Sequence, residues 1–507
     1  MAKEKSHDGS HRNHPPGHCP RLRTACAPVL PGHPLRSPSG GRPALAVAQP
    51  PEPWEGVRDA TEYGPNSLQS SIASDIPLPP QPRRPMSEDC LYLNVVTPGL
   101  SGSRPVMVWI HGGGFTTGSG ADFAGRQLAE RGVVVVAMNY RLGALGSLAL
   151  PALADRKGRF TNFGLRDQIA ALRWVHDNIA SFGGDPDNVT IFGESAGGLS
   201  VGSLLGSPEA KGLFHRAIPQ SGAGHQARPA DEALSASEQF CELLGVRPDD
   251  PAALRAASPE AILEVSDAME VSAGPAPMRA RKPPAMAHTP VIDGQCLLAL
   301  PIEGLRRGHG SAVPVMAGWT ADEWSLFEPM WENGPPSADE LESHFGEFGP
   351  PRPMHRAYLD ARAARGDSTA PGDVWSAALA DWMFRVPADR LLEANATAGR
   401  PTYGYVFTWE SPVEGLGACH SLDVLFVTGT YTLAPDFAGS GPAADALANT
   451  MMDAWVAFAT NGDPSTPSLH WPRFETDTRP IMVLGEQCHM VEGWHEEERR
   501  AWDGVIP

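Results

Sequence analysis

Residues 189–198 read Val189-Thr190-Ile191-Phe192-Gly193-Glu194-Ser195-Ala196-Gly197-Gly198. The first half is apolar, as in a buried β-strand, and it runs without a loop into Gly-Glu-Ser-Ala-Gly, after which small residues begin a helix. A glycine two positions to either side of Ser195 keeps side chains away from backbone that must pass very close. The five-residue pattern alone would also fit a Gly/Ser-rich turn, but the preceding strand and the following helix favour a nucleophile elbow.

An elbow of this kind determines what two of its residues can do. The Ser195 hydroxyl would project above the edge of the sheet, and the Ala196 N–H would lie at the start of the helix, where a developing anion is stabilised. We therefore predict that Ser195 is a nucleophile and that Ala196 is one donor of an oxyanion hole.

A glycine-rich loop precedes the elbow in the chain. Residues 106–110 form a continuous apolar run, typical of a strand covered on both faces, and it ends in His111-Gly112-Gly113-Gly114-Phe115. Glycines let backbone N–H groups point into a site without obstruction by a Cβ atom. A phosphate-binding loop is the alternative, but no Gly-Lys-Ser/Thr follows, and Thr117 stands where a G-x-G-x-x-G loop needs its last glycine. We predict Gly113 and Gly114 as the other oxyanion donors.

The segments between these motifs indicate an α/β fold. Residues 132–140 read as a second buried strand, and apolar residues recur at helical spacing from 162 to 182, just before the strand of the elbow. A strand, a helix and a strand in this order form a βαβ crossover, so the sheet is at least partly parallel. Asp167 lies near the apolar face of that helix. We expect it to be exposed, with a buried structural role as the alternative.

Composition limits the partners and the compartment. The 507 residues are 41% apolar and carry a net charge of −19, from 59 acidic and 40 basic residues. That charge opposes binding to nucleic acid or to anionic membranes. Seven widely spaced cysteines suggest neither a disulfide framework nor a zinc site. With no apolar targeting segment and no run long enough to span a membrane, we expect a soluble cytoplasmic protein.

Several segments together resemble the type-B carboxylesterases, a family that includes cholinesterases and bacterial para-nitrobenzyl esterases. They are residues 88–95, the loop at 111–115, Asn139-Tyr140-Arg141, residues 182–186 and residues 192–198. The resemblance runs from about Pro50 to the C-terminus. It implies an α/β-hydrolase fold, with a large, mostly parallel central sheet, helices on both faces and cap insertions, in a single domain over 49–507. A monomer is plausible.

The resemblance also places the rest of a catalytic triad. Glu323, which follows a strand at 313–318, matches the acid that orients the histidine, and Asp322 is its neighbour and natural control. Without the resemblance, this Asp-Glu pair would be interpreted as an exposed helix start. His420 matches the base; the family usually has Gly or Ala after it, where this chain has Ser421. Ser221 matches a second serine, expected to support the site.

These residues imply a serine carboxylesterase. His420, oriented by Glu323, would take the Ser195 proton as the serine attacks an ester, and water would later release the acyl group. No cofactor and no metal is expected. The alternatives are a catalytically silent, cholinesterase-like binding protein or an inactive product of a damaged gene. A nucleophilic Cys419 is a weaker alternative, since no elbow presents it.

The segment at 76–85 bears on the substrate. Cholinesterases carry a tryptophan for a quaternary ammonium there, whereas this segment is mostly Pro and Arg. A choline site is therefore not expected. Small, largely neutral esters are the predicted substrates, although the sequence does not specify the natural one.

Residues 1–48 differ from the rest of the chain. They are crowded with Pro, Gly, His and Arg and have no period of 2 or 3.6, so we interpret them as non-native-looking or disordered. The family instead begins with a segment like Arg-Gly-Ile-Pro-Tyr-Ala. Degenerate codons for residues 31–46, read one nucleotide later, permit the longer form of that segment, Arg-Gly-Ile-Pro-Tyr-Ala-Pro-Pro-Pro-Val-Gly-Ala-Leu-Arg-Trp, at every position. Our hypothesis is a frameshift near residues 46–49 that replaced the genuine N-terminal strands.

Overall fold

The structure is a computed structural model, and it describes residues 23–28, 45–48, 55–56, 60–69, 78–79, 82, 84–272, 286–331, 334–348 and 351–506. Most of residues 1–48 thus lie outside the described residues, so the prediction for the N-terminal segment is not tested. Within the described part, no helix is long and apolar enough to cross a membrane.

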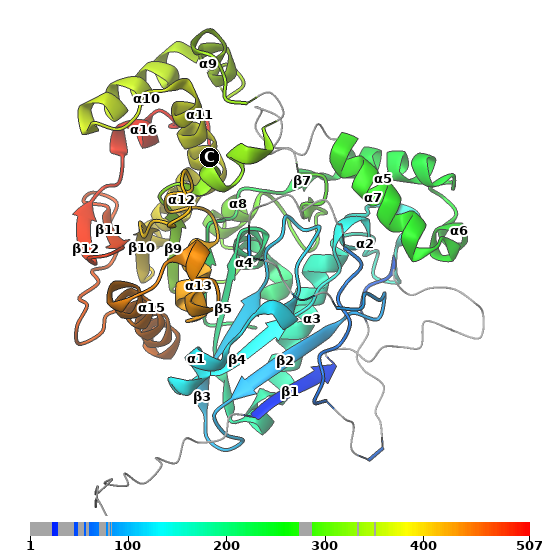
Figure 1. Cartoon of the computed structure of the whole chain (residues 1–507). Helices are drawn as coiled ribbons and strands as arrows, with labels where there is room; N and C mark the ends of the chain where they lie inside the picture. Colours follow the sequence, from blue (N-terminus) through cyan, green and yellow to red (C-terminus); the bar gives the residue numbers. More distant parts are fainter. Residues whose placement is uncertain are drawn as a thin grey trace, which may run out of the picture.

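A 10-stranded sheet runs through the molecule (Figure 1) in the order β1-β2-β4-β3-β5-β6-β9-β10-β11-β12. Its strands are β1 Arg23–Pro28, β2 Tyr92–Thr97, β3 Arg104–Ile110, β4 Val134–Met138, β5 Gly184–Glu194, β6 Arg216–Gln220, β9 Val315–Thr320, β10 Thr402–Phe407, β11 Pro480–Leu484 and β12 His489–Glu492. Strands β7 (Arg228–Pro229) and β8 (Val291–Ile292) form a separate parallel pair.

The sheet is parallel in its centre and antiparallel at both edges. Neighbouring strands from β4 through β3, β5, β6, β9 and β10 to β11 are parallel. At the edges, β2 runs antiparallel to both β1 and β4, and β12 runs antiparallel to β11. The central strands are apolar without alternation because helices cover them on both sides. The sequence-based prediction of an α/β-hydrolase fold is confirmed.

The helices are α1 Arg126–Glu130, α2 Gly143–Ser147, α3 Phe163–Asn178, α4 Ala196–Gly206, α5 Ala230–Leu244, α6 Pro251–Ala256, α7 Pro259–Ser272, α8 Pro301–Arg306, α9 Ala338–Phe345, α10 Pro351–Arg365, α11 Pro371–Ala380, α12 Val386–Thr397, α13 Leu422–Val427, α14 Pro435–Ala438, α15 Pro442–Asn461 and α16 Glu496–Arg500. Two layers of helices pack on the central strands. In one layer α3 contacts α4, α4 contacts α8, and α8 contacts α12; in the other, α1 and α13 both contact α15.

Two helical groups lie beside the sheet as insertions between strands (Figure 1). Helices α5 to α7 occur between β7 and β8, and α9 to α11 occur between β9 and β10. The first group packs on α2. It has its own apolar cluster, separate from the main core, and that cluster includes Phe240, Leu254 and Ile262. These groups are the cap insertions that the family resemblance implies.

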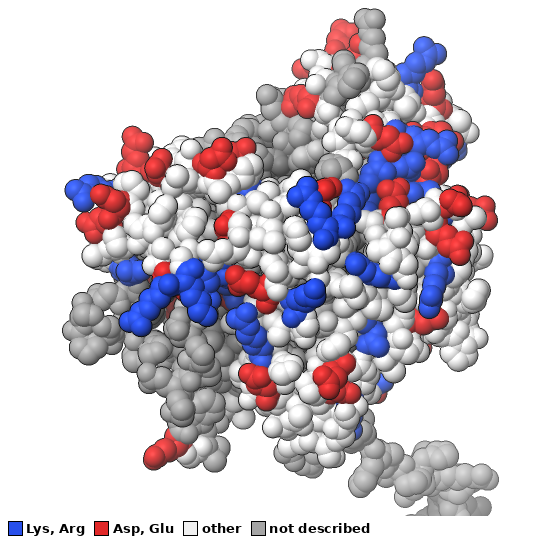
Figure 2. All heavy atoms as spheres, turned by 180° about the vertical axis from the view of Figure 1, so that it is seen from behind, with Lys and Arg blue, Asp and Glu red and all other residues white. Residues whose placement is uncertain are grey.

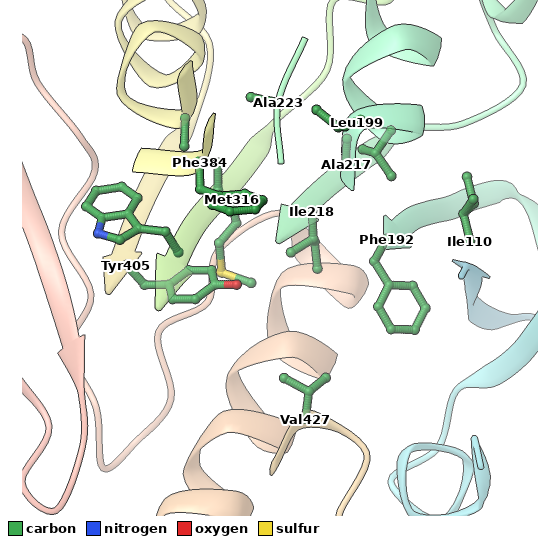
Figure 3. Close-up of a cluster of buried hydrophobic side chains, with 14 of the residues drawn as sticks. Ile110, Phe192, Leu199, Ala217, Ile218, Ala223, Met316, Phe384, Tyr405 and Val427 are labelled. Carbon is green, nitrogen blue, oxygen red and sulfur yellow. The ribbon is translucent and has the colours of Figure 1, made fainter. Parts of the chain in front are cut away.

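The main core lies between the sheet and its helices. Figure 3 shows Ile110, Phe192, Ile218, Met316 and Tyr405, from five adjacent central strands, beside Leu199 of α4 and Val427 of α13. All of these side chains are buried. Burial of a large apolar side chain stabilises the fold by roughly 1.5–3 kcal/mol, so the strand ends that carry the site rest on a firmly packed base.

One sequence-based expectation about the core is wrong. Asp167 is 2% exposed, not solvent-facing. Its Oδ1 lies 2.6 Å from Arg141 Nη2, and its Oδ2 accepts from Arg141 Nε at 2.7 Å and from the Arg141 backbone N–H at 3.1 Å. A buried carboxylate is tolerable only with such compensation, and the sequence contained no sign that Arg141 would supply it.

Candidate active site

All candidate site residues follow the carboxyl ends of neighbouring parallel strands. The glycine loop follows β3, Ser195 follows β5, Ser221 follows β6, Glu323 follows β9, and the loop that carries His420 follows β10. The carboxyl edge of an open α/β sheet is where such folds bind ligands. The topology therefore gathers residues from 111 to 420 at one edge.

Ser195 has the backbone of a strained elbow. Its φ of 58° and ψ of −125° are rare for a residue with a side chain. The strain persists because the turn is packed on both sides: a Cβ atom on Gly193 would lie 2.5 Å from the Ile110 carbonyl oxygen, and one on Gly197 would lie 2.0 Å from it. The two glycines of the motif thus permit the close approach of β3.

His420 and Glu323 are in direct contact. Nδ1 of His420 lies 2.5 Å from Oε2 of Glu323, and both side chains are buried. The other oxygen of Glu323 accepts the backbone N–H of Thr320 at 2.8 Å. This second bond fixes the carboxylate, which in turn fixes the imidazole with Nδ1 toward the acid and Nε2 away from it.

Glu194 is a second acid at the histidine, and the sequence reasoning missed it. Its Oε1 lies 3.1 Å from His420 Nε2, and its side chain is buried. It occupies the variable position of the elbow motif directly before Ser195. The position of Glu194 next to the nucleophile was visible in the sequence. Its approach to His420, which lies 226 positions later in the chain, depends on the fold.

Asp423 is a third buried carboxylate that acts electrostatically on His420. Its Oδ2 accepts from Gln220 Nε2 at 2.9 Å and from the Tyr405 hydroxyl at 3.3 Å. Burial raises the pKa of Asp423 to about 6. A carboxylate three residues after His420 was visible in the sequence, but its hydrogen-bond partners were not.

Burial and charge oppose each other at His420. Burial alone would lower the pKa of the imidazole, but the negative charges of Glu194 and Glu323 outweigh it and raise that pKa to about 9. Burial also raises the pKa of Glu194 to about 7, against the opposing effect of the His420 charge. The acids around His420 therefore favour its protonated form.

Nε2 of His420 has no hydrogen-bond partner among the described residues. The bond to Ser195 that a complete triad requires is thus not formed in this structure. Catalytic hydrogen bonds are often long or poorly aligned without substrate and tighten only when it binds. The free nitrogen is the atom that would accept the serine proton.

The glycine loop contacts the elbow through Gly112, and Ala196 directly follows Ser195. Gly113 and Gly114 have φ angles of 97° and 62°, and a Cβ atom on Gly112 would lie 3.0 Å from the Ser195 Cβ, so the loop packs directly on the elbow. Ala196 is the first residue of α4, where the N–H groups have no acceptor within the helix. The assignment of Gly113, Gly114 and Ala196 as oxyanion donors stays a prediction.

Ser221 lies at the end of β6, fully buried, with a φ of 45°. Its hydroxyl has no hydrogen-bond partner among the described residues. The next residue touches the elbow, because a Cβ atom on Gly222 would lie 2.6 Å from the Ser195 carbonyl oxygen. The supporting role of Ser221 remains a prediction.

A cavity of about 470 Å³ opens beside these residues. The site contributes Gly112, Gly113, Glu194 and Ser421 to its wall. Most of the remaining lining is apolar and includes Trp109, Phe123, Val424, Leu425 and Leu433. A cavity of this size and polarity suits an organic molecule of moderate size with few charges.

No group of three or more His, Cys, Asp or Glu side chains in the described part of the chain could hold a metal ion.

Comparison with known proteins identifies relatives along nearly the whole chain. The model of the carboxylesterase family matches residues 37–502. The para-nitrobenzyl esterase of Bacillus subtilis (strain 168) is 34% identical over 476 residues, which cover 92% of this chain and 93% of the relative. The fumonisin B1 esterase of Sphingopyxis macrogoltabida is 35% identical over 487 residues, covering 91% of this chain and 84% of the relative.

Solved structures agree. A para-nitrobenzyl esterase matches with a TM-score of 0.80 and 30% identity, over 96% of each chain. A carboxylesterase of Geobacillus stearothermophilus, at pH 6.2, also matches with a TM-score of 0.80, at 36% identity, over 95% of this chain and 96% of that one.

Proposed function

This chain belongs to the carboxylesterase family and hydrolyses carboxylic esters, and from that premise we propose that Ser195, His420 and Glu323 are its catalytic triad. The observation that carries the proposal is the contact of 2.5 Å between His420 Nδ1 and Glu323 Oε2. This contact holds the imidazole so that Nε2 makes no hydrogen bond to another described residue. Nε2 can then act as the base for Ser195 at the strained elbow.

Acylation would begin with proton transfer. As Ser195 Oγ attacks the carbonyl carbon of the ester, His420 Nε2 takes the serine proton, and Glu323 stabilises the imidazolium that forms. The carbonyl oxygen becomes an oxyanion, which the N–H groups of Gly113, Gly114 and Ala196 would stabilise. Support comes from the positive φ angles of the two glycines and from the helix start at Ala196.

The tetrahedral intermediate then loses the alcohol. His420 Nε2 returns its proton to the leaving oxygen as the carbon–oxygen bond breaks, which leaves an acyl group on Ser195. Water, deprotonated by the same nitrogen, attacks the acyl carbon, and the proton returns to Ser195 Oγ as the acid departs.

A para-nitrophenyl ester tests this mechanism. We expect a burst of nitrophenolate and an acyl adduct on the peptide that contains Ser195, detected by mass spectrometry of rapidly quenched protein. Ser195→Ala should lose at least about 10⁴-fold in kcat with its fold intact. An adduct on another residue, or unchanged turnover by the variant, would refute the assignment.

Small, largely neutral esters are the proposed substrates. The mostly apolar lining of the cavity supports this class, because apolar surface favours uncharged groups. The two charged side chains of the lining outside the site, Arg84 and Asp122, pair with each other. Part of the segment at 76–85, where a choline-binding tryptophan was not expected, lies outside the described residues. An acyl- and alcohol-length series would identify the preferred ester.

A reducing, cytoplasmic setting is proposed as well. Free thiols at Cys90, Cys241, Cys296, Cys419 and Cys488 support it. We also propose that the chain binds no nucleic acid. The net charge of −19 supports the absence of a nucleic-acid partner, and on the face seen in Figure 2 acidic side chains are interspersed among the basic ones.

A further inference from the structure

Ser421 lies between His420 and α13 in a conformation that L-residues rarely adopt, with a φ of 67° and a ψ of −3°. A serine at the start of a helix usually caps one of the first helical N–H groups. Here its side chain makes no capping bond, and its hydroxyl donates to Oε1 of Glu194 at 2.6 Å. The strained backbone thus directs the hydroxyl to the site and not to the helix.

The oxygen that Ser421 binds is the one nearest the catalytic base. Glu194 Oε1 lies 3.1 Å from His420 Nε2, yet Nε2 has no hydrogen-bond partner among the described residues. The carboxylate is therefore close enough to attract an imidazolium, but it is not aligned to bind the Nε2 hydrogen.

Among the residues that the structure describes, Ser421 is the sole hydrogen-bond donor to the Glu194 carboxylate. The other acids facing His420 are held independently of it: Glu323 by the Thr320 N–H, and Asp423 by Gln220 and Tyr405. In the described part of the chain, no second N–H or hydroxyl donates to the Glu194 carboxylate. Its orientation thus depends on one hydroxyl.

We propose that Ser421 is a positioning residue for ester hydrolysis, whose hydroxyl holds Glu194 beside His420 but out of line with Nε2. This inference rests on the proposed triad. The arrangement leaves Nε2 free to take the Ser195 proton, while the charge of the Glu194 carboxylate stabilises the imidazolium as it forms. Without the hydroxyl, Oε1 would turn to its nearest remaining donor, the Nε2–H of protonated His420, and would hold the base in its inactive form.

The charged groups that face His420 are Glu323 at Nδ1, Glu194 at Nε2 and Asp423 from α13, while the rings of Phe327 and Phe384 cover it. Glu194 in turn faces His420, Asp423 and Glu323. Loss of the Ser421 hydroxyl changes the partner of one of these acids only. The pH dependence of hydrolysis should therefore report the change.

The test compares Ser421→Ala and Ser421→Gly with the unchanged protein on para-nitrophenyl acetate over a range of pH. Both variants lack the hydroxyl, but glycine also relieves the positive φ. We expect both to raise the pKa that governs kcat/KM by about one unit, which is about tenfold in rate on the acidic limb. On the alkaline plateau their rates should approach that of the unchanged protein.

Two further variants make the result specific. In a Glu194→Gln background, Ser421→Ala should produce no further shift, because the group that it releases has lost its charge. Ser368→Ala removes another serine–carboxylate bond, to Asp373 on the surface, and should leave the profile unchanged.

The proposal is overturned if the Ser421 variants keep the pH profile of the unchanged protein, or if only Ser421→Ala is affected. The latter would indicate backbone strain and not the hydroxyl as the cause. Either failure is distinct from failure of the triad, since Ser195→Ala would still be inactive.

Discussion

Oδ2 of Asp322 accepts the backbone N–H of Ala418 at 2.9 Å, and the Asp322 N–H donates to the Ala418 carbonyl at 3.0 Å. Ala418 lies two residues before His420, so Asp322 ties the histidine loop to the end of β9. Glu323, the next residue, contacts the imidazole itself. Two adjacent acids thus have separate tasks, one on the backbone of the loop and one on the base.

Substitution of each acid should reveal this division. Glu323→Gln removes the charge that stabilises the imidazolium, and we expect kcat to fall by about 10⁴-fold, as when a triad acid becomes an amide. Asp322→Asn keeps an oxygen for the Ala418 N–H and should change kcat by less than about threefold. Steady-state kinetics on one ester would check both, and the reverse ranking would mean that Asp322 is the triad acid.

The pH dependence should reflect the carboxylates around the base. An isolated histidine titrates near pH ~6.5, whereas the pKa of His420 is raised to about 9 by Glu194 and Glu323, against the effect of burial. Because only neutral imidazole accepts the serine proton, kcat/KM should increase with pH up to about 9. Glu194→Gln removes one charge that favours the imidazolium, so the rise should move to lower pH.

A pH–rate profile of the two proteins checks this prediction, with Glu232→Gln on the surface helix α5 as the charge-matched control. A rise that stays at the same pH in Glu194→Gln would show that Glu194 does not act on His420.

Some of this site could be predicted from residues alone, and some could not. Ser195 and the oxyanion glycines follow from local patterns, because an elbow and a glycine loop are built from consecutive residues. His420 and Glu323 required the family resemblance, since a single histidine among 17 carries no local signature. The approach of Glu194 to His420 and the hydrogen bond from Ser421 to Glu194 are tertiary, because they depend on parallel strands whose carboxyl ends, those of β5 and β10 included, meet at the same edge of the sheet.

The error at Asp167 has the same physical cause. Helical periodicity indicated which face it lies near, but burial depends on whether a partner reaches it. That partner, Arg141, comes from the loop after β4 and supplies three donors. Pairing between elements is a tertiary property, so a periodic pattern cannot reveal it.

The buried Arg141–Asp167 pair should be important for stability. Asp167→Ala would leave the Arg141 guanidinium buried without its counter-charge, and we expect the free energy of unfolding to decrease by about 3–5 kcal/mol. Urea denaturation would measure it. Glu130→Ala, which breaks the exposed pair with Arg126, is the control and should cost less than about 0.5 kcal/mol. Equal losses in the two variants would contradict the assigned role of burial.

The predicted frameshift at the N-terminus can be tested by resequencing the gene. We propose that residues 1–48 are the result of a frameshift near residues 46–49. The described parts of this segment are the backbone of β1, which pairs with β2, and residues 45–48, where Leu45 and Val47 are buried and Ala46 accepts a hydrogen bond from Arg141. Resequencing should show nucleotides that spell the family segment in the second frame. If they do not, the hypothesis is wrong.

A repaired N-terminus would also be expected to stabilise the protein, because the genuine strands would replace out-of-frame residues at the edge of the sheet. Thermal unfolding of the corrected and uncorrected proteins would measure the difference.

The separate apolar cluster under α5 to α7 has a consequence for local unfolding of the protein. Since Phe240, Leu254 and Ile262 pack in a cluster distinct from the one beneath the triad, we expect helices α5 to α7 to open without exposing the core that supports Ser195. Regions with their own small core often behave as separate cooperative units, whose amide protons exchange with solvent well before those of the central strands. The catalytic edge would then remain assembled while the neighbouring helices fluctuate, and mutations could accumulate in those helices at little cost to the chemistry.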